Sequence, residues 1–548
     1  MNNSKKITYL LIFSVILVQF AGMFLPFTGD AGKYAAVSKT MYQNHEFWDL
    51  YIHGSPYYQK PPFLMWLSVA GYFLTGTVNN FTTRIFPVLF TILMLFSTYK
   101  LGKYFYSERT GKLAAFFMAS TQIFILYNTD LHTDSVLTAC TITAIWQLVL
   151  YIDRRKWYNF VLGFLFIGFA MLTKGPIGLA VPVFAIATHL LMKRNFKMIF
   201  RLEWLAGAVI LLAMLYPHLK LLYQNFGWEG PKFYFWTNNA GRITGTYKGG
   251  NSDPFFYIYN LLVFTLPWSF IFAGGLVRQL LNLFRNKTEK TKEYYTLGGA
   301  VVLIFVLSFA KMKSPNYFYP AIPLLSILAA EFFFNILKSK KVRRLVIAQD
   351  ILNSMVWVLT FVIMIWMFPF NNIAGWIVVA ALAVLHLLLL IKERDPKYRI
   401  INSALVAIVV LNLVINTHLL PIIFNYQASL HAAKIYNEKA SDDDIFYTYR
   451  YAQFEMFFYA KNEGFKIIDE GTAYDPVLIE FEEAIQNKGA WFFADEYSYG
   501  QIKEESLELE QEYVFDHFYL TDISWQFLNP RTRKSVLKKM YLVKTIAE

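Results

Sequence analysis

The residues of this sequence best suited to chemistry lie in a polar interval, 28–62, between two strongly apolar segments. Asp30, Lys33 and Tyr34 fall within about one helical turn there, and Lys60 stands just before two prolines. Residues three or four apart share a helix face, so we expect the carboxylate of Asp30 and the ammonium of Lys33 to face one cavity. A simpler alternative is that Asp30 caps a helix and Lys33 reaches lipid headgroups.

A second acidic cluster lies at 128–134, between two later apolar segments. It contains Asp130, His132 and Asp134. Charged groups beside apolar segments are costly unless they are paired or hydrated, so carboxylates from two separate loops indicate a shared polar cavity. Either Asp130 or Asp134 also fits the simpler role of a helix cap.

Cations and a tyrosine follow in three further loops. Lys174 lies in a Lys-Gly-Pro turn, Arg242 in a long polar loop, and Lys311, Lys313 and Tyr317 close together in a third loop. Ammonium, guanidinium and phenol groups bind phosphate oxygens directly, so we expect an anionic headgroup or phosphate as their partner. Contact with ordinary lipid phosphates explains any one of them, but is a poorer explanation for the whole set.

The composition predicts the scaffold that positions these loops. Of 548 residues, 56% are hydrophobic and only 16% charged, and the mean hydropathy is +0.36, which indicates a polytopic α-helical membrane protein. About 13 apolar segments are long enough to cross a bilayer. They lie near 7–27, 83–103, 112–127, 135–152, 158–174, 176–192, 205–222, 255–280, 296–310, 316–337, 347–369, 374–391 and 402–424.

Charge and cysteine content exclude two other interpretations. The net charge is +13, but the basic residues lie in short loops between apolar segments rather than on one patch, which argues against nucleic-acid binding. The single cysteine, Cys140, rules out an intrachain disulfide. The fold must therefore be held together by helix packing.

The basic loops also predict the orientation in the membrane. Lys5 and Lys6 precede the first apolar segment, which is too long for a cleaved signal peptide, so we place the amino terminus in the cytoplasm. The polar interval and the other candidate residues then lie on the outer face of the cytoplasmic (inner) membrane. The loops assigned to the cytoplasm are all basic and lie at 100–112, 154–156, 193–201, 285–292, 338–344 and 392–399.

The composition changes after residue 425, where acidic and polar residues become frequent and long apolar segments end. We predict a transmembrane domain at 1–425, with 28–82 as its first outer loop, and a soluble extracytoplasmic α/β domain at 426–548. Its expected role is structural or acceptor-recruiting, without catalytic groups. Its expected strands lie at 444–449, 465–469 and 490–494, and its expected helices at 452–461 and 478–488.

Taken together, the motifs resemble those of the polyprenyl-phosphate-dependent membrane glycosyltransferases of GT-C architecture, especially the lipid A aminoarabinose transferases and the protein O-mannosyltransferases. The resemblance covers roughly residues 7–424 and is weak beyond them. The motifs that carry it are GDAGKYA at 29–35, YYQKPP at 57–62, Asp134 at the head of an apolar segment, LTKGP at 172–176, LPWS at 266–269 and KMKSPNY at 311–317.

This resemblance implies an inverting enzyme that moves a sugar from a polyprenyl-phosphate carrier to a lipid, glycan or protein acceptor. It also implies roles for individual residues. They are Asp30 and Asp134 as catalytic carboxylates, Lys33, Tyr34, Lys60 and Tyr317 around the donor phosphate, and Asp130, Lys174, Arg242 and Lys313 as further candidates for the cavity.

The chain departs from the family pattern at three points. Ala31 follows Asp30 where the family often has a second acidic residue, Gln59 stands where the aminoarabinose transferases have glutamate, and 237–239 reads TNN in place of a histidine-containing motif. That glutamate and histidine help to bind a metal in those enzymes, so we predict no metal here, and no nucleotide cofactor. The sugar and the acceptor stay open.

A transporter or flippase of lipid-linked glycans is the alternative function. It predicts polar residues deep within several spans and two similar halves of the chain, neither of which the sequence shows clearly.

Overall fold

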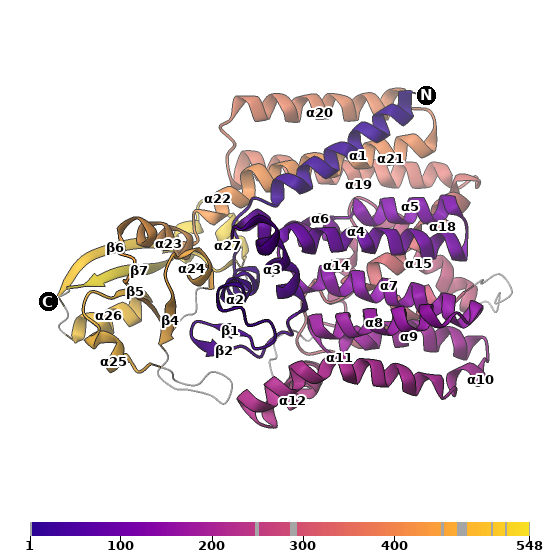
Figure 1. The fold of residues 1–548 in the computed structure, drawn as a ribbon. Helices are drawn as coiled ribbons and strands as arrows, with labels where there is room; N and C mark the ends of the chain where they lie inside the picture. The colour runs from indigo at the N-terminus through magenta and orange to yellow at the C-terminus, as the bar shows by residue number, and fades with distance from the viewer. Residues whose placement is uncertain are drawn as a thin grey trace.

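The computed structural model describes residues 3–246, 251, 253–284, 293–450, 454–467, 479–505, 508–520 and 523–546. Most of the helices run side by side in one bundle, and a smaller part that contains a β-sheet lies at one end of it (Figure 1).

Nine helical stretches of the described residues are long and apolar enough to cross a membrane. They are α1 (Asn3–Gly22), α4 (Asn80–Phe105), α7 (Thr133–Arg154), α8 (Trp157–Lys174), Phe196–Phe226 with α10 (Phe196–Ile199) and α11 (Glu203–Phe226), Tyr319–Leu337 with α18 (Ile322–Leu337), Val342–Met367 with α19 (Val342–Val362), α20 (Ile373–Lys392), and Pro396–Phe424 with α21 (Pro396–Val414) and α22 (Leu420–Phe424).

The other predicted spans are also helical, but shorter or interrupted. They correspond to α5 (Glu108–Ala119) with α6 (Gln122–Thr129), α9 (Ile177–Met192), α14 (Phe256–Phe264) with α15 (Ser269–Phe284), and α16 (Tyr295–Leu297) continuing to α17 (Leu303–Ser308). The polytopic helical fold class is thus confirmed, whereas a count of about 13 spans stays a prediction.

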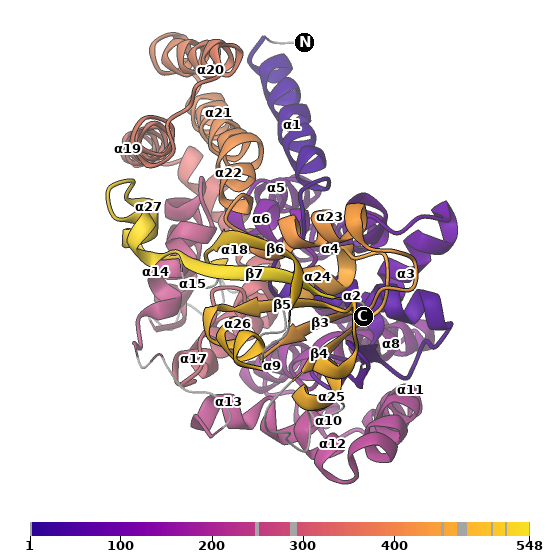
Figure 2. The same ribbon diagram turned by 90° about the vertical axis from the view of Figure 1, so that its left-hand side faces the viewer.

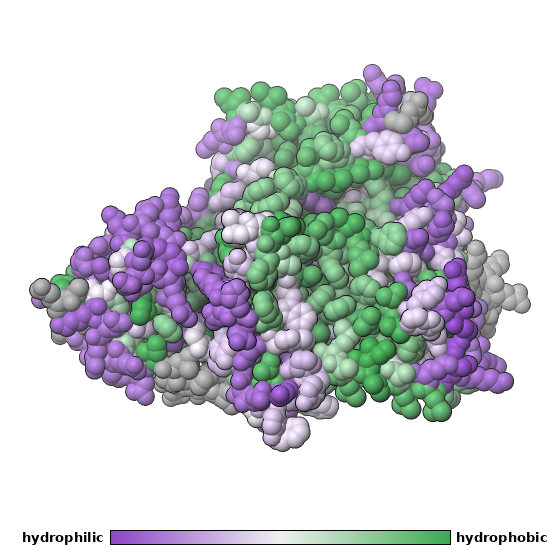
Figure 3. Space-filling view, viewed as in Figure 1, coloured by the Kyte–Doolittle hydropathy of each residue, from purple (hydrophilic) through white to green (hydrophobic). Residues whose placement is uncertain are grey.

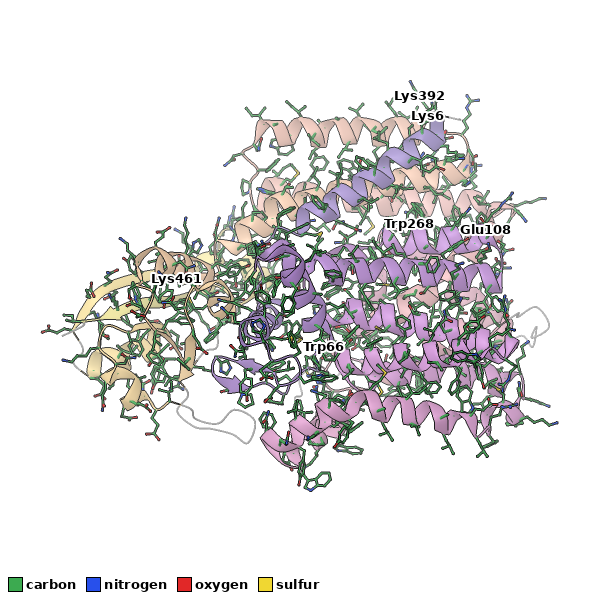
Figure 4. The ribbon with its side chains drawn as sticks, in the orientation of Figure 1. Lys6, Trp66, Glu108, Trp268, Lys392 and Lys461 are labelled. Carbon is green, nitrogen blue, oxygen red and sulfur yellow. The ribbon has the colours of Figure 1, made fainter. Side chains whose placement is uncertain are left out.

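Two of the interruptions lie against each other. The indole Nε1 of Trp268 donates to the hydroxyl of Ser120 at 2.9 Å, and the backbone N–H of Gln122 donates to the carbonyl of Leu266 at 2.8 Å. Backbone polar groups in hydrocarbon need partners within the protein. Each interruption therefore supplies hydrogen-bond partners for the other, which is a structural role for the LPWS motif. Figure 4 labels Trp268 inside the bundle.

The surface of the bundle is typical of a protein in lipid. A broad apolar band crosses it between polar residues at the sheet end and polar residues at the opposite end (Figure 3). Large apolar side chains such as Leu17, Leu212 and Ile377 are at least half exposed in this band. Water disfavours such a surface, whereas hydrocarbon does not.

One end of the bundle carries the amino terminus and a basic loop, and the other end carries the sheet-containing part. Lys6 and Lys392 lie at the end opposite Lys461, which belongs to the sheet-containing part (Figure 4). The amino terminus and the basic loop at 392–399 therefore share one end, as predicted. The basic loop at 285–292 lies outside the described residues.

The polar interval forms a platform at the sheet end. It consists of α2 (Asp30–Asn44), a hairpin of β1 (Tyr51–Ile52) and β2 (Ser55–Pro56), and α3 (Phe63–Thr75), which begins directly after the two prolines. Nine of the 15 residues of α2 are buried. The helix packs against α3 and against α24 (Phe454–Tyr459) of the carboxyl-terminal part, which covers it.

The carboxyl-terminal part contains a five-stranded mixed sheet in the order β4-β3-β5-β7-β6. It lies across the end of the bundle (Figure 2). Strands β3, β4 and β5 are parallel, and β7 is antiparallel to both β5 and β6. The strands are β3 (Phe446–Tyr449), β4 (Gly464–Ile467), β5 (Trp491–Asp495), β6 (Leu509–His517) and β7 (Lys538–Thr545), and the helices around them are α23 (Ala428–Lys439), α24, α25 (Phe481–Gln486), α26 (Glu496–Glu504) and α27 (Trp525–Leu528).

Strands lie at all three predicted positions, and helices at both, whereas β6 and β7 were not predicted. Parts of the predicted segments, at 452–453, 468–469 and 478, lie outside the described residues. The division of the chain at 425 and 426 stays a prediction.

Candidate active site

A polar cavity of about 670 Å³ lies where the bundle, the platform and the carboxyl-terminal part meet. Every predicted site residue lines it except Asp134 and Lys313. Those that line it are Asp30, Lys33, Tyr34, Lys60, Asp130, Lys174, Arg242 and Tyr317.

The first turn of α2 carries an ion pair. The Nζ of Lys33 lies 2.8 Å from Oδ1 of Asp30 and donates to Oε1 of Gln59 at 3.0 Å. Burial raises the pKa of Asp30, but the charge and hydrogen bond of Lys33, together with other nearby charges such as Lys60, lower it to about 2. Asp30 is not the helix cap, because the N-cap position is Gly29. Its side chain is 60% exposed, so the carboxylate is an anion open to the cavity.

Further cations gather at the same cavity. Burial lowers the pKa of Lys60 well below its usual range, and the nearby charges of Lys174 and Arg242 lower it further. Arg242 donates to the hydroxyl of Tyr317, and Nζ of Lys174 lies 4.6 Å from the centre of the Tyr317 ring. Like charges this close destabilise one another unless an anion lies between them. This wall is therefore suited to a phosphate.

Tyr34 is buried beside the ion pair, and burial raises the pKa of its phenol well above the usual value. It therefore stays neutral and can act as a hydrogen-bond donor at physiological pH.

Asp134 is 1% exposed at the start of α7. It does not line the polar cavity but lines the apolar groove that adjoins it. Nζ of Lys174 lies 2.6 Å from each of its oxygens, Asn316 donates to it at 2.6 Å, and Nδ1 of His132 lies 3.0 Å away. Three side chains thus bind this carboxylate, and its predicted catalytic role stays a prediction.

Asp130 and Lys313 also differ in their settings. Asp130 ends α6, and its Oδ1 accepts from the backbone N–H of Leu131 at 2.9 Å while the residue lines the cavity. Lys313 is directed away, because its Nζ donates to the carbonyls of Asn251 and Asp253 at 3.2 and 2.8 Å. Lys313 therefore ties a loop in place.

An apolar groove of about 260 Å³ adjoins the cavity. Lys60, Lys174, Arg242 and Tyr317 line both spaces, so the cations stand at their junction. The remaining groove residues are mostly apolar and come largely from α9 and α17; they include Ile177, Ala180, Phe184, Leu303, Val306 and Leu307. A ligand with an anionic group between a polar and a long apolar part fits this geometry.

The carboxyl-terminal part contributes residues that the sequence pattern did not reveal. Glu455 lines the cavity and accepts a hydrogen bond from the backbone N–H of Gly29, directly before Asp30. Phe454 covers the ammonium of Lys33 at 4.9 Å, and His517 and Tyr519 line the same space. No local motif marks these residues, since they reach the site only through the tertiary fold.

Amide side chains occupy the positions that correspond, by the sequence resemblance, to the metal site of the aminoarabinose transferases. Asn238 donates to the backbone carbonyl of Gln59 at 3.3 Å and accepts from Nε of Arg242 at 2.9 Å. Amides lack the anionic or imidazole donors that transition metals prefer. Among the described residues, no group of three or more His, Cys, Asp or Glu side chains could hold a metal ion. A reaction without a metal stays a prediction.

Comparison with known proteins agrees with the motifs. Residues 59–220 match a family model described as dolichyl-phosphate-mannose-protein mannosyltransferase. An undecaprenyl phosphate-alpha-4-amino-4-deoxy-L-arabinose arabinosyl transferase from Edwardsiella ictaluri is 25% identical over 339 residues, 60% of each chain. An uncharacterized protein from Aquifex aeolicus is 29% identical over 57% of this chain and 60% of its own. The chain thus spans at most 60% of the length of these relatives.

The fold comparison extends over the whole chain. The crystal structure of ArnT from Cupriavidus metallidurans bound to undecaprenyl phosphate superposes with a TM-score of 0.76 at 17% identity and covers 98% of this chain and 97% of its own. The same protein in the apo state gives the same score. The chain therefore has the fold of a GT-C membrane glycosyltransferase and resembles the aminoarabinose transferases and protein mannosyltransferases, as its motifs predict.

Proposed function

We propose that the chain is an inverting glycosyltransferase that moves a sugar from a polyprenyl-monophosphate carrier to a lipid, glycan or protein acceptor. One observation carries the proposal: the cations at the junction of the polar cavity and the apolar groove. A polyprenyl-phosphate sugar has a phosphate between a sugar and a long hydrocarbon chain, so its three parts match the cavity, the junction and the groove in order.

The donor phosphate would be bound by Lys60, Lys174, Arg242 and Tyr317. These are the polar residues that line both spaces. An anion among them offsets the mutual repulsion that lowers the pKa of Lys60. Lys33 and Tyr34 lie on the sugar side of the junction, where the cavity is polar. Undecaprenyl phosphate in the related ArnT structure supports this class of carrier.

The reaction would be a single displacement at the anomeric carbon. The acceptor oxygen forms the new bond to carbon, the bond from carbon to phosphate oxygen breaks, and the electron pair stays on the carrier phosphate. Cations already in place stabilise the charge that develops on this leaving group. Asp30, an exposed anion that lines the cavity, would bind the attacking hydroxyl. We propose no nucleotide cofactor and no metal.

The active site would face the outside of the cytoplasmic membrane. The lysines at the amino terminus and the basic loop at 392–399 lie at the end opposite the cavity, and positive charge favours the cytoplasmic side. The sheet-containing part would then be extracytoplasmic.

A transfer assay without ATP tests the proposal. Purified full-length protein is incubated with labelled undecaprenyl-phosphate hexoses and pentoses and with membrane lipid and protein acceptors, and label is followed from carrier to acceptor. Replacing Lys60 with methionine should reduce donor binding at least tenfold, because a buried donor to the phosphate is lost. The control Lys112→Met, an exposed lysine paired to Glu108 at the other end, should not change it. Movement of intact donor across vesicle membranes, without transfer, would instead indicate a flippase.

A further inference from the structure

The roles given above to the charged residues and to the sequence motifs do not explain why His132 lies in the cavity. It precedes α7 (Thr133–Arg154), lines the polar cavity, and is 14% exposed. The Tyr127 ring packs edge-on against the imidazole, with 4.9 Å between the ring centres. The imidazole is therefore held in one orientation with one edge towards the cavity.

The contacts of this ring assign its proton. Nδ1 lies 3.0 Å from the carboxylate of Asp134 and 3.5 Å from the backbone N–H of the same residue. The shorter contact is the one that an N–H makes with an anion, so Nδ1 carries the hydrogen and Nε2 carries the lone pair. Among the described residues, Nε2 of His132 makes no hydrogen bond or ion pair, although His132 lines the cavity.

Asp134 is also held in place by several contacts. Its carboxylate is buried and is also bound by Lys174 and Asn316. A carboxylate fixed in this way orients the imidazole and stabilises the imidazolium that forms when Nε2 takes up a proton. Asp134 is therefore a positioning residue, and the basic atom offered to the cavity is Nε2 of His132.

Resting on the proposed function, we infer that His132 is the general base that takes the proton from the acceptor hydroxyl during sugar transfer. The acceptor oxygen bonds to the anomeric carbon, its proton passes to Nε2, and the carrier phosphate leaves with the electron pair. Asp30 then orients the hydroxyl.

The state of Asp30 supports this division of roles. Burial raises its pKa, but Lys33 and other nearby charges together lower it to about 2, and a carboxylate that weakly basic is a poor proton acceptor near neutral pH. Asp30 and His132 line the same cavity.

Two substitutions separate catalysis from a structural role. His132 is also the N-cap of α7, and asparagine is among the best N-cap residues but cannot accept the proton. Both His132→Ala and His132→Asn should therefore lose a factor of about 100 to 10,000 in transfer rate. Imidazole added to the solution should raise the rate of His132→Ala. The control His431→Ala, at a histidine of α23 far along the chain, should leave the rate unchanged.

The full-length protein is measured with undecaprenyl-phosphate sugars for transfer and with undecaprenyl phosphate for binding. The inference requires that binding stay within about twofold of native in both variants while transfer is lost. A His132→Asn rate within tenfold of native, a parallel loss of carrier binding, or no effect of imidazole on His132→Ala would each overturn it. Native protein that moves sugar from none of the donors would overturn the proposed function, and this inference with it.

Discussion

The hydrogen bond between Glu455 and the backbone N–H of Gly29 is expected to hold the first turn of α2 in place. Replacing Glu455 with alanine removes the acceptor of this hydrogen bond. An intramolecular hydrogen bond of this kind contributes about 0.5–1.5 kcal/mol. At 1.36 kcal/mol per factor of ten, local opening at residues 29–33 should become about 2 to 13 times more frequent.

Glutamine at position 455 is the matched control. Burial raises the pKa of Glu455, so the neutral amide resembles the protonated side chain and keeps the oxygen that accepts from Gly29. Because burial raises the folded pKa, the contribution of this side chain to stability is fully present below the unfolded pKa and falls as the pH rises through the folded value, where a buried charge forms. Glu455→Gln should remove this pH dependence.

Hydrogen–deuterium exchange measured by mass spectrometry reports this opening directly. Peptides that cover 27–34 should exchange faster in Glu455→Ala and at the native rate in Glu455→Gln, while peptides of α20 stay unchanged in both. Unchanged exchange at 27–34 in the alanine variant would refute the reasoning. An equal increase in both variants would do so too, since it would assign the effect to the negative charge rather than to the hydrogen bond.

Three further predictions concern stability in detergent, measured by thermal unfolding. Lys174→Met should cost about 3–5 kcal/mol, because Asp134 is left buried without its cation, and adding Asp134→Leu should restore part of it. Gly32→Leu should cost about 1–3 kcal/mol, because a Cβ there already lies 3.2 Å from α24, whereas Gly500→Ala meets nothing within 4 Å; equal losses would contradict this. Asp30→Asn should differ from native above pH 4 and converge with it as the pH falls through about 2, since the depressed pKa makes the ionised form the stabilising one.

Much of the site could be predicted because membrane topology restricts where loops can meet. The segments that carry Asp30, Asp130, Lys174 and Tyr317 follow spans that end on the same side, so their convergence needed only the span pattern and the basic loops. The helical spans were found because apolar length is a strong signal.

Other features depend on contacts between distant parts of the chain. The burial of α2 depends in part on the later helix α24, and Glu455 reaches the cavity across 426 positions of sequence. The different roles of Asp130 and Asp134 depend on which carboxylate Lys174 and Asn316 reach, which spacing along the sequence does not define. The sequence motif could not show that Lys313 lies outside the cavity, because the carbonyls that it binds lie in a loop some 60 residues earlier.

The paired helix breaks at Ser120 and at Trp268 have a consequence for assembly in the membrane. Their partners are 148 residues apart, so the ribosome completes the first break well before the second exists. Until then the polar backbone around Gln122 lacks the carbonyl of Leu266 and is poorly suited to hydrocarbon. The segment at 108–129 should therefore remain beside the insertion machinery or in contact with water until residues 256–284 arrive. Truncated chains that end before residue 256 should leave it accessible to aqueous labelling reagents.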